Sequence, residues 1–415
     1  MSFWDSSMEC APSDVRADYQ MQALRKHVSR TAKLSPFYAG RLSVREITSV
    51  EDYFAAVEPV TKLDILADAA ENPPYGNLLA VPPTDLVRLF VHPGPQVMAW
   101  TANDQQAIVN MYAQGISTVG FDATDLVDVT FQYAWVMAGL IWDAAVQRIG
   151  AAAAPGGAGG TIEHLENLRS LRLTGLMGFP TYLEEIGVRA REQGIDLAVD
   201  KLLVIGEMRG QDAKERLRDL YGASWVREGY GTAEAGLVAA ECGDSNGGMH
   251  VHQDIIIEVR DPVTGALVEE GQSGELYLTP LGREAMPLLR FKTGDITEYL
   301  QTEPCPCGRT SPRMGRILGR ASDLFRVKGV FLAPAVVTDV VTDGGRRPCD
   351  YRIVISRPEL KDHIALQLAY DGEDAAAVTE VVRQRFKERC RVSVDIEVVR
   401  VGTLPEGTRA IEDHR

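Results

Sequence analysis

The chain has 415 residues and a formal net charge of −15, with 45% hydrophobic and 24% charged residues. This length predicts about two or three domains, and the composition is ordinary for a globular protein. The acidic balance argues against nucleic acid or anionic membranes as partners, since both need clustered positive charge. No apolar run reaches the roughly 18 residues of a membrane helix, because Asp143 interrupts the best candidate at residues 136–146. The first residues lack signal-peptide features, so we expect a cytoplasmic protein.

The N-terminal three quarters of the chain predict an α/β fold. The first forty residues favour helix, because apolar residues such as Leu24 and Val28 recur at helical spacing after a cap at Ser13. Strands are expected at residues 86–91, 126–133, 171–177 and 202–205, and helices at residues 104–115, 141–150 and 182–193. Strands that alternate with helices at this spacing indicate a mainly parallel sheet. The Ala/Gly-rich residues 151–160 are expected to form a loop.

After about residue 247 the pattern changes to antiparallel strands and then to a small α+β domain. The antiparallel strands are expected at residues 251–259, 274–278 and 296–300, separated by turns such as Asp261-Pro262. The last part of the chain predicts strands at residues 351–356 and 363–370, a helix at 375–390 and a strand at 392–401. We therefore expect a large N-terminal domain of mixed sheets and helices and a smaller C-terminal α+β domain.

The cysteines suggest a metal site rather than a disulfide framework, because six are too few for such a framework in a chain of this length. The isolated cysteines are expected to be unpaired thiols: Cys10, Cys349 and Cys390. Three thiolates and an imidazole form a set suited to tetrahedral zinc: Cys242, His250, Cys305 and Cys307. His252 is a rival for the imidazole, because it shares a strand face with His250. Reduced thiols in a turn are the alternative to a metal site.

One short string, Gly229-Tyr-Gly-Thr-Ala-Glu234, combines flexibility with ligand chemistry. Glycines on both sides of an aromatic residue allow a loop to press its backbone onto a ligand. Thr232 can donate a hydrogen bond to a phosphate, and Glu234 can hold Mg²⁺ through a carboxylate oxygen. Taken alone, the string is more typical of a plain turn than of a ligand site.

Further strings extend this pattern along the chain. Residues 289–295 read Leu-Arg-Phe-Lys-Thr-Gly-Asp, and residues 312–323 contain Arg-Met-Gly-Arg-Ile-Leu-Gly-Arg. In this order the strings resemble the adenylate-forming superfamily, which includes acyl-CoA synthetases, peptide-synthetase adenylation domains and luciferases. The Cys-Pro-Cys-Gly-Arg-Thr segment that begins at Cys305 looks specifically like that of phenylacetate–CoA ligases. The resemblance spans nearly the whole chain.

The resemblance implies an adenylate-forming domain at residues 1–321, a hinge near Ser322 and a lid at residues 322–415. It implies nucleotide contacts from six residues: Gly206, Glu207, Tyr230, Gly231, Asp295 and Arg320. It implies catalytic roles for three residues: Thr232, Glu234 as Mg²⁺ ligand, and Arg409. It implies acyl-pocket walls from four residues that are as compatible with an ordinary core: Tyr133, Trp135, Gly139 and Phe179. It also supports the zinc site, because some relatives hold zinc in this way.

The activity implied is ligation of a small carboxylic acid to CoA or another thiol carrier. ATP and Mg²⁺ would convert the acid to an acyl-adenylate, and the thiol would then displace AMP. The available Tyr and Trp walls and the resemblance suggest an aromatic acid. A homodimer is compatible with the sequence.

Two departures from the family pattern affect the handling of ATP. Residues 91–97, where the family has a Ser/Thr/Gly loop for the β- and γ-phosphates, contain no hydroxyl, and Pro93 and Pro95 lack amide donors. Thr408 stands where the family has a lysine, and the nearest cation is Arg409; Ser322 replaces a hinge aspartate, a milder change. These departures leave a second hypothesis open: an adenylation-deficient homologue that acts as a binding or scaffold protein, or as an ATP-independent acyl transferase.

Overall fold

The structure is a computed structural model of the whole chain. It describes residues 3–42, 47–92, 96–207, 211–244, 248–323, 325–327, 330–332, 334–342, 350–358, 362–390, 392–405 and 409–414. The chain divides into two compact units, one of Met1–Thr293 with Thr297–Arg316 and one of Gly294–Ile296 with Ile317–Arg415. Each unit is described by itself below.

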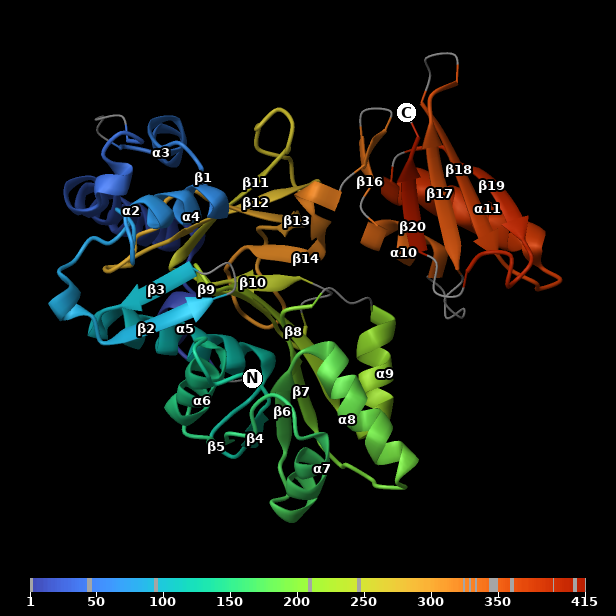
Figure 1. Cartoon of the computed structure of the whole chain (residues 1–415), viewed down its shortest axis with the longest axis horizontal. Coiled ribbons are helices and arrows are strands. Elements are labelled where there is room, and N and C mark those ends of the chain that lie inside the picture. Colours follow the sequence, from blue (N-terminus) through green and yellow to red (C-terminus); the bar gives the residue numbers. More distant parts are fainter. Residues whose placement is uncertain are drawn as a thin grey trace. The chain divides into compact units, whose positions relative to one another are not determined.

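The helices of the first unit cover both ends of a large sheet (Figure 1). Their bounds are α1 (Ser6–Glu9), α2 (Ser13–Leu34), α3 (Val50–Ala56), α4 (Lys62–Glu71), α5 (Ala102–Val119), α6 (Ala138–Arg148), α7 (Thr161–Ser170), α8 (Pro180–Glu192) and α9 (Gln211–Tyr221). Capping boxes begin α3, α4 and α5, where Ser49, Thr61 and Thr101 each exchange hydrogen bonds with an aspartate three residues later. Local sequence therefore determines where these helices start.

The large sheet has a parallel half and an antiparallel half. Its strands are β1 (Val60–Thr61), β4 (Leu126–Val129), β5 (Ala152–Ala154), β6 (Gly175–Gly178), β7 (Lys201–Val204), β8 (Trp225–Thr232), β9 (Gly236–Glu241), β10 (Met249–Val251), β11 (Ile255–Arg260), β12 (Ser273–Pro280), β13 (Phe291–Gln301) and β14 (Arg313–Arg320). The order is β11-β12-β13-β14-β10-β9-β8-β7-β6-β4-β5, and β1 pairs with β13. The pairs from β5 to β8 are parallel, whereas β8–β9, β9–β10 and β11–β12 are antiparallel.

The parallel half matches the predicted strand–helix alternation, and α8 and α9 lie side by side against it (Figure 1). Apolar residues of the helices and strands share one core, which includes Leu183, Ile186, Leu202 and Leu217. Because parallel strands end at the same edge, the segments that follow β4, β6 and β7 meet there with the end of β8. Ligands of open α/β sheets bind outside this edge.

Two predictions about this region were wrong. The strand expected at residues 86–91 lies outside the parallel sheet: β2 (Arg88–His92) forms a separate antiparallel hairpin with β3 (Gln96–Trp100). Residues 151–160 contain the edge strand β5 as well as loop, and the next helix, α7, was not predicted. Strand β5 consists of three alanines and carries no alternating pattern, and the sequence of β2 does not show that its partner is β3.

The second unit is a small α+β domain, as predicted. Its elements are β15 (Phe325–Val327), β16 (Val330–Leu332), α10 (Pro334–Thr342), β17 (Tyr351–Ser356), β18 (His363–Ala369), α11 (Ala375–Arg385), β19 (Asp395–Val399) and β20 (Arg409–Asp413). The sheet order is β19-β18-β17-β20, and alternate residues of β17 are buried. Apolar side chains from both helices, such as Val337 and Val378, pack onto Tyr351 and Ile353 in one core.

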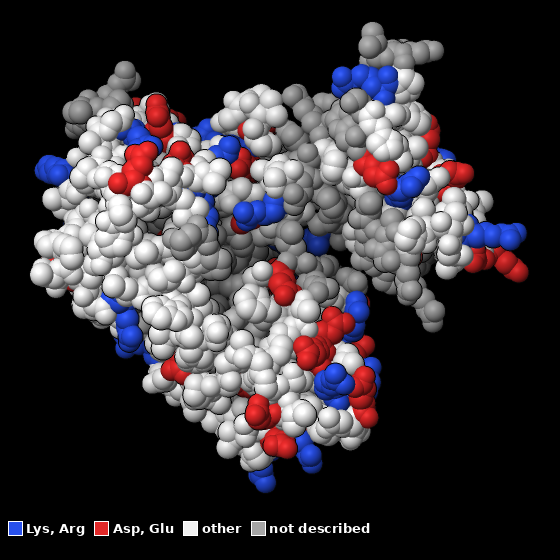
Figure 2. All heavy atoms as spheres, viewed as in Figure 1, with Lys and Arg blue, Asp and Glu red and all other residues white. Residues whose placement is uncertain are grey.

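The described surface carries mixed charge. Figure 2 shows acidic and basic side chains intermixed over α8 and α9, where Arg216 pairs with Glu184 at 3.0 Å. This face therefore lacks, among its described residues, the clustered positive charge of a nucleic-acid surface. Among the described helices, none combines the length and apolar character needed to cross a bilayer.

Candidate functional site

The string predicted to contact the nucleotide forms the tight connection between β8 and β9. Tyr230 lies near the end of β8 and is 8% exposed. A Cβ atom added to Gly231 would lie 2.6 Å from the carbonyl oxygen of Gly236, so a side chain does not fit there. Thr232 Oγ1 accepts a hydrogen bond of 3.0 Å from the Ala235 amide and closes the turn. The backbone of this connection is therefore closely constrained.

Glu234 lies within this turn and is 7% exposed, an unusual position for a carboxylate. Its Oε1 atom is 3.4 Å from the ammonium of Lys62, the first residue of α4. His92, at the end of β2, belongs to the same electrostatic cluster. Burial lowers the pKa of His92; the negative charge of Glu234 opposes this effect, and Lys62 adds to it. A carboxylate, an ammonium and a neutral imidazole thus gather at one place.

Lys62 is the residue of this cluster that sequence reasoning missed. Lys62 and Glu234 lie far apart in the sequence. The capping box at Thr61, just before Lys62, indicates only that a helix starts there. His92 immediately precedes the loop in which the sequence departs from the family pattern. Residues 93–95 of that loop lie outside the described residues, as does Thr408.

Gly206 and Glu207 follow β7 at the carboxyl edge of the parallel strands. Gly206 adopts a φ of 87°, and an added Cβ would lie 2.5 Å from the Phe179 ring, so the ring packs directly on its backbone. Glu207 Oε2 accepts hydrogen bonds from the Thr181 amide at 2.9 Å and from the Thr181 hydroxyl at 2.5 Å. These bonds tie the residues after β7 to the start of α8.

The residues predicted to line an acyl pocket adjoin the same edge but differ in exposure. The Tyr133 ring packs on Gly139, where an added Cβ would lie 2.5 Å from the ring, and its hydroxyl donates to Asp143 at 3.2 Å. Phe179 is 39% exposed. Trp135 is 78% exposed and has a φ of 65°, a strained conformation for a tryptophan. Its carbonyl accepts a 2.8 Å hydrogen bond from Val91 of β2, which ties this turn to the hairpin.

The second unit holds two of the predicted nucleotide contacts. Asp295 of β13 is 8% exposed and accepts a short hydrogen bond from Arg320 Nη1, at the end of β14. The two residues are therefore neighbours, although 25 positions separate them in sequence. Arg409 begins β20, where its backbone pairs with Tyr351.

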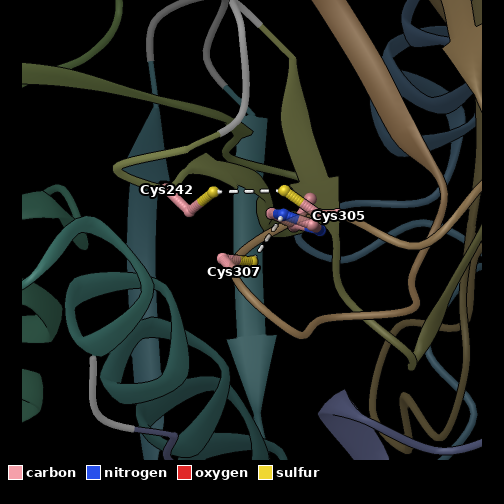
Figure 3. Close-up of side chains that lie close together, drawn as sticks. Cys242, Cys305 and Cys307 are labelled. Carbon is pink, nitrogen blue, oxygen red and sulfur yellow. Dashed lines mark hydrogen bonds between the residues drawn. The ribbon is translucent and has the colours of Figure 1, made fainter.

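Three thiols and one imidazole converge in the first unit (Figure 3). Cys242 follows β9, His250 lies on β10, and Cys305 and Cys307 lie between β13 and β14. All four ligand atoms lie within 4.8 Å of one another, and the four residues are buried. His250 rather than the rival His252 supplies the imidazole of this cluster. The antiparallel pairing of β9 with β10 places Cys242 and His250 together.

The spacing within this cluster fits a tetrahedral metal. The Sγ atoms of Cys242 and Cys305 are 3.7 Å apart, and Cys307 Sγ is 3.4 Å from His250 Nε2. Zinc bonds of about 2.3 Å to sulfur and about 2.0–2.1 Å to nitrogen place such pairs about 3.8 and 3.5 Å apart in a tetrahedron. A disulfide would require about 2.05 Å between the sulfurs, so the described cysteines are free thiols.

Neighbouring groups prepare these side chains for a metal. His250 Nδ1 lies 3.1 Å from Ser311 Oγ, which leaves Nε2 to face the sulfurs, and burial lowers the pKa of His250 to about 3. Burial raises the pKa of Cys242 to about 12 in the absence of metal. Burial also acts on Cys307, but hydrogen bonds from Arg309 outweigh it and lower the pKa of that thiol.

Arg309 in turn forms a buried ion pair with Glu9 of α1, in which Arg309 Nε lies 2.6 Å from Glu9 Oε2. The N-terminal helix is therefore joined directly to the cysteine loop.

Comparisons with known proteins identify relatives that match most of the chain. No protein-family model matches the chain. The phenylacetate–coenzyme A ligase of Pseudomonas putida is 28% identical over 96% of this chain and 93% of its own length. The chain is a homologue of the phenylacetate–CoA ligases. The phenylacetate–coenzyme A ligase of Thermus thermophilus is 27% identical to this chain, over 88% of this chain and 84% of the ligase.

Solved structures show the same fold. The homologue matches an open conformation of 2-hydroxyisobutyryl-CoA ligase in complex with 2-HIB-AMP and CoA, with a TM-score of 0.84 and 26% identity, over all of this chain and 94% of that one. Apo MatB from Rhodopseudomonas palustris, at a TM-score of 0.57 and 16% identity over 82% of this chain and 69% of that one, supports the fold alone. The predicted superfamily and fold class are confirmed.

Proposed function

We propose that the chain is an AMP-forming acid–CoA ligase. It converts a small carboxylic acid to an acyl-adenylate with ATP and then transfers the acyl group to CoA. The observation that carries this proposal is similarity along almost the whole chain to phenylacetate–CoA ligases and to a ligase structure that holds an acyl-AMP and CoA.

In the first half-reaction, a carboxylate oxygen of the acid attacks the α-phosphorus of ATP, and pyrophosphate leaves. The thiolate of CoA then attacks the acyl carbonyl carbon, and AMP leaves. Tyr230 and Gly231 line the adenine, with Gly206 and Glu207 on the facing wall. Thr232 donates its hydroxyl hydrogen to a phosphate, because its Oγ1 acts only as an acceptor toward Ala235.

Asp295 accepts hydrogen bonds from the ribose hydroxyls, with Arg320 beside the nucleotide. The short bond from Arg320 to Oδ1 does not exclude this role, because an ionised carboxylate offers about four acceptor sites. Glu234 is the ligand proposed for Mg²⁺, which neutralises phosphate charge when bound. The ion pair with Lys62 does not exclude this role, because an ionised carboxylate offers about four acceptor sites.

We propose that Lys62 and His92 take over part of the work of the missing phosphate-loop hydroxyls. Each donor lost from a preorganised anion site costs about 2.7–4 kcal/mol of transition-state stabilisation, so compensation is needed. Lys62 is 42% exposed at its side chain and sits against Glu234, where its ammonium can reach a phosphate held by the metal. His92 adds a nearby ring nitrogen.

The acid is proposed to be aromatic. Phe179 and Tyr133 present rings at the carboxyl edge of the sheet, and Phe179 also meets Phe131 edge to face at 5.4 Å. Gly139 is too close to the Tyr133 ring to carry a side chain, so this wall has a defined shape. Trp135 is exposed enough to close over a bound acid.

A structural zinc ion is proposed for the cluster of Cys242, His250, Cys305 and Cys307. Three thiolates and a neutral imidazole are a common donor set for structural zinc, and their spacing fits a tetrahedron. The cluster links β9, β10 and the loop before β14, so zinc would stabilise the fold rather than supply chemistry.

The C-terminal residues 322–415 are proposed to act as a lid that turns at a hinge near Ser322 between the two half-reactions. Arg409 is the cation proposed to approach the substrate carboxylate, because Thr408 cannot replace the lysine of the family.

Pyrophosphate release in the presence of ATP, Mg²⁺ and a panel of aromatic and aliphatic acids tests the proposal. Glu234→Gln and Asp295→Ala are each expected to lower the rate at least tenfold, since each removes a charge that contacts the nucleotide or its metal. Titration calorimetry separates the rival function: binding of an acyl-CoA without any binding of ATP would indicate an ATP-independent transferase or a binding protein.

A further inference from the structure

A small cavity lies between the β2–β3 hairpin and the turn that carries Glu234, within the first unit. Its polar lining comes from the hairpin and from buried residues around it: Gln96, Trp100, Asp104, Glu234 and Arg283. Each of these side chains is at most 8% exposed. The remaining lining is apolar and includes Met98 and Leu288.

Three polar atoms that belong to this lining find no hydrogen-bond partner among the residues that the structure describes. They are Gln96 Oε1, Trp100 Nε1 and Glu234 Oε1. Lys62 lies at ion-pair distance, 3.4 Å, from the last of these. Buried polar atoms without hydrogen bonds are rare in folded proteins, so Gln96 Oε1 and Trp100 Nε1 need a partner, and Glu234 Oε1 has the Lys62 ammonium nearby but no hydrogen bond. By contrast, Asp104 accepts backbone hydrogen bonds from residues 101, 284 and 285.

The size and chemistry of the cavity select one water molecule as that partner. Its volume is about 20 Å³, and a water needs roughly 10–15 Å³ by the same measure together with two to four polar partners. Trp100 and Arg283, whose side chains donate hydrogen bonds, also line this space, which favours a water over a cation inside it. A water has the groups needed to accept from an indole N–H and to donate to an amide oxygen and a carboxylate oxygen.

We propose that a buried water joins Trp100 and Gln96 to Glu234 Oε1 and fixes the orientation of that carboxylate. This inference rests on the proposed role of Glu234 as the Mg²⁺ ligand. Trp100 and Gln96 are then positioning residues, which act on the metal through the water and the carboxylate. The hairpin that replaces the usual phosphate loop thereby contributes to catalysis through its buried side chains.

Trp100→Phe removes the N–H donor, and Gln96→Met removes the amide at nearly constant volume. In each variant we expect the Mg²⁺ concentration for half-maximal pyrophosphate release to rise about fivefold, the effect of one lost hydrogen bond between neutral groups. The KM for the acid should stay unchanged. Trp225→Phe is the matched control, because Trp225 packs against Phe121 at 5.3 Å, outside the cavity, and should leave the Mg²⁺ dependence as in the unsubstituted chain.

A crystal structure of the full chain at high resolution gives a second readout that does not depend on activity. An ordered water within about 3.2 Å of both Trp100 Nε1 and Glu234 Oε1 is expected; a direct bond between these atoms, or no water there, overturns the inference. If Glu234→Gln abolishes activity while both hairpin variants keep the original Mg²⁺ dependence, the inference fails and the proposed function stands. If Glu234→Gln is fully active, the proposed function fails instead. If Trp100→Phe does not fold, Gln96→Met and the crystal structure decide.

Discussion

Gly231→Ala should separate the role of the β8–β9 connection from that of its charged residues. The added methyl group would lie 2.6 Å from the Gly236 carbonyl oxygen, and contacts under 3.0 Å are essentially never seen for real Cβ atoms. Both partners are backbone atoms of paired strands, so neither can rotate away. The pair must open by at least about 0.4 Å, and Glu234, three residues further on, must move with it.

The expected magnitudes follow from this displacement. Overpacking of this kind costs about 1–3 kcal/mol of stability, which lowers Tm by roughly 2–10 °C. Because a misplacement of about 1 Å can reduce a rate by 10²-fold, we expect pyrophosphate release to fall by one to two orders of magnitude. The activity should therefore fall far more than the folded fraction at 25 °C.

Gly40→Ala is the matched control. An added Cβ at Gly40 meets nothing within 4 Å, and the residue does not need a positive φ. Differential scanning calorimetry and a pyrophosphate assay on both variants provide the comparison. If Gly231→Ala matches Gly40→Ala within twofold in rate and 1 °C in Tm, the steric reasoning for this turn is refuted.

The other predictions concern the metal, the phosphates and pH. Cys242→Ala should reduce bound zinc, measured by plasma emission, from about one equivalent to below a tenth, whereas His252→Ala should retain it. Loss of zinc from His252→Ala would reassign the imidazole ligand to His252. Lys62→Met should raise the KM for ATP about tenfold and leave the KM for the acid unaltered, since Lys62 is a partly exposed charge beside Glu234 and is proposed to reach the phosphates; an equal rise in both constants would contradict this. Burial disfavours charge on His164, but the hydrogen bond and charge of Asp128 at 2.6 Å outweigh it and raise the His164 pKa. The pair therefore stabilises the fold fully below about pH 6.5, the pKa of histidine in the unfolded chain. This stabilisation is lost as the pH rises through the higher pKa of His164 in the folded protein. The Tm of His164→Gln should lack this pH dependence.

The parts of the fold that could be predicted are those with a clear apolar period. The strand predicted at residues 351–356 is β17, whose alternate side chains are buried, and the expected helix near residues 182–193 is α8. Strand β5 consists of three alanines, which carry no alternating pattern. Strand β3 follows Pro93 and Pro95, and prolines in the sequence argue against a strand pair there. These elements form because tertiary neighbours are available, a signal that local sequence does not contain.

The site shows the same division. The sequence alone indicates individual residues with distinctive chemistry. These are the cysteines near His250, as metal ligands, and Glu234 in its glycine-containing string, as a cation ligand. Which of them share a space depends on strand pairing, and only the structure places His250 rather than His252 with the thiols. The pairing of Lys62 with Glu234 had no sequence signal, because a lysine at the start of a helix is usually a solvated surface residue.

Under the proposed function, the residues proposed for the adenine and those proposed for the phosphates are held in place in different ways. Tyr230 and Gly231 are positioned by backbone pairing of β8 with β9, and a side chain added at Gly231 would press on the paired strand. The groups near Glu234 come instead from side chains on separate elements, Lys62 on α4 and His92 on β2. A phosphate held by side-chain charge needs no particular loop length, whereas a phosphate held by backbone amides does. The short, proline-containing loop is therefore compatible with adenylation provided that the charge near Glu234 remains, and this charge is what the Lys62 substitution removes.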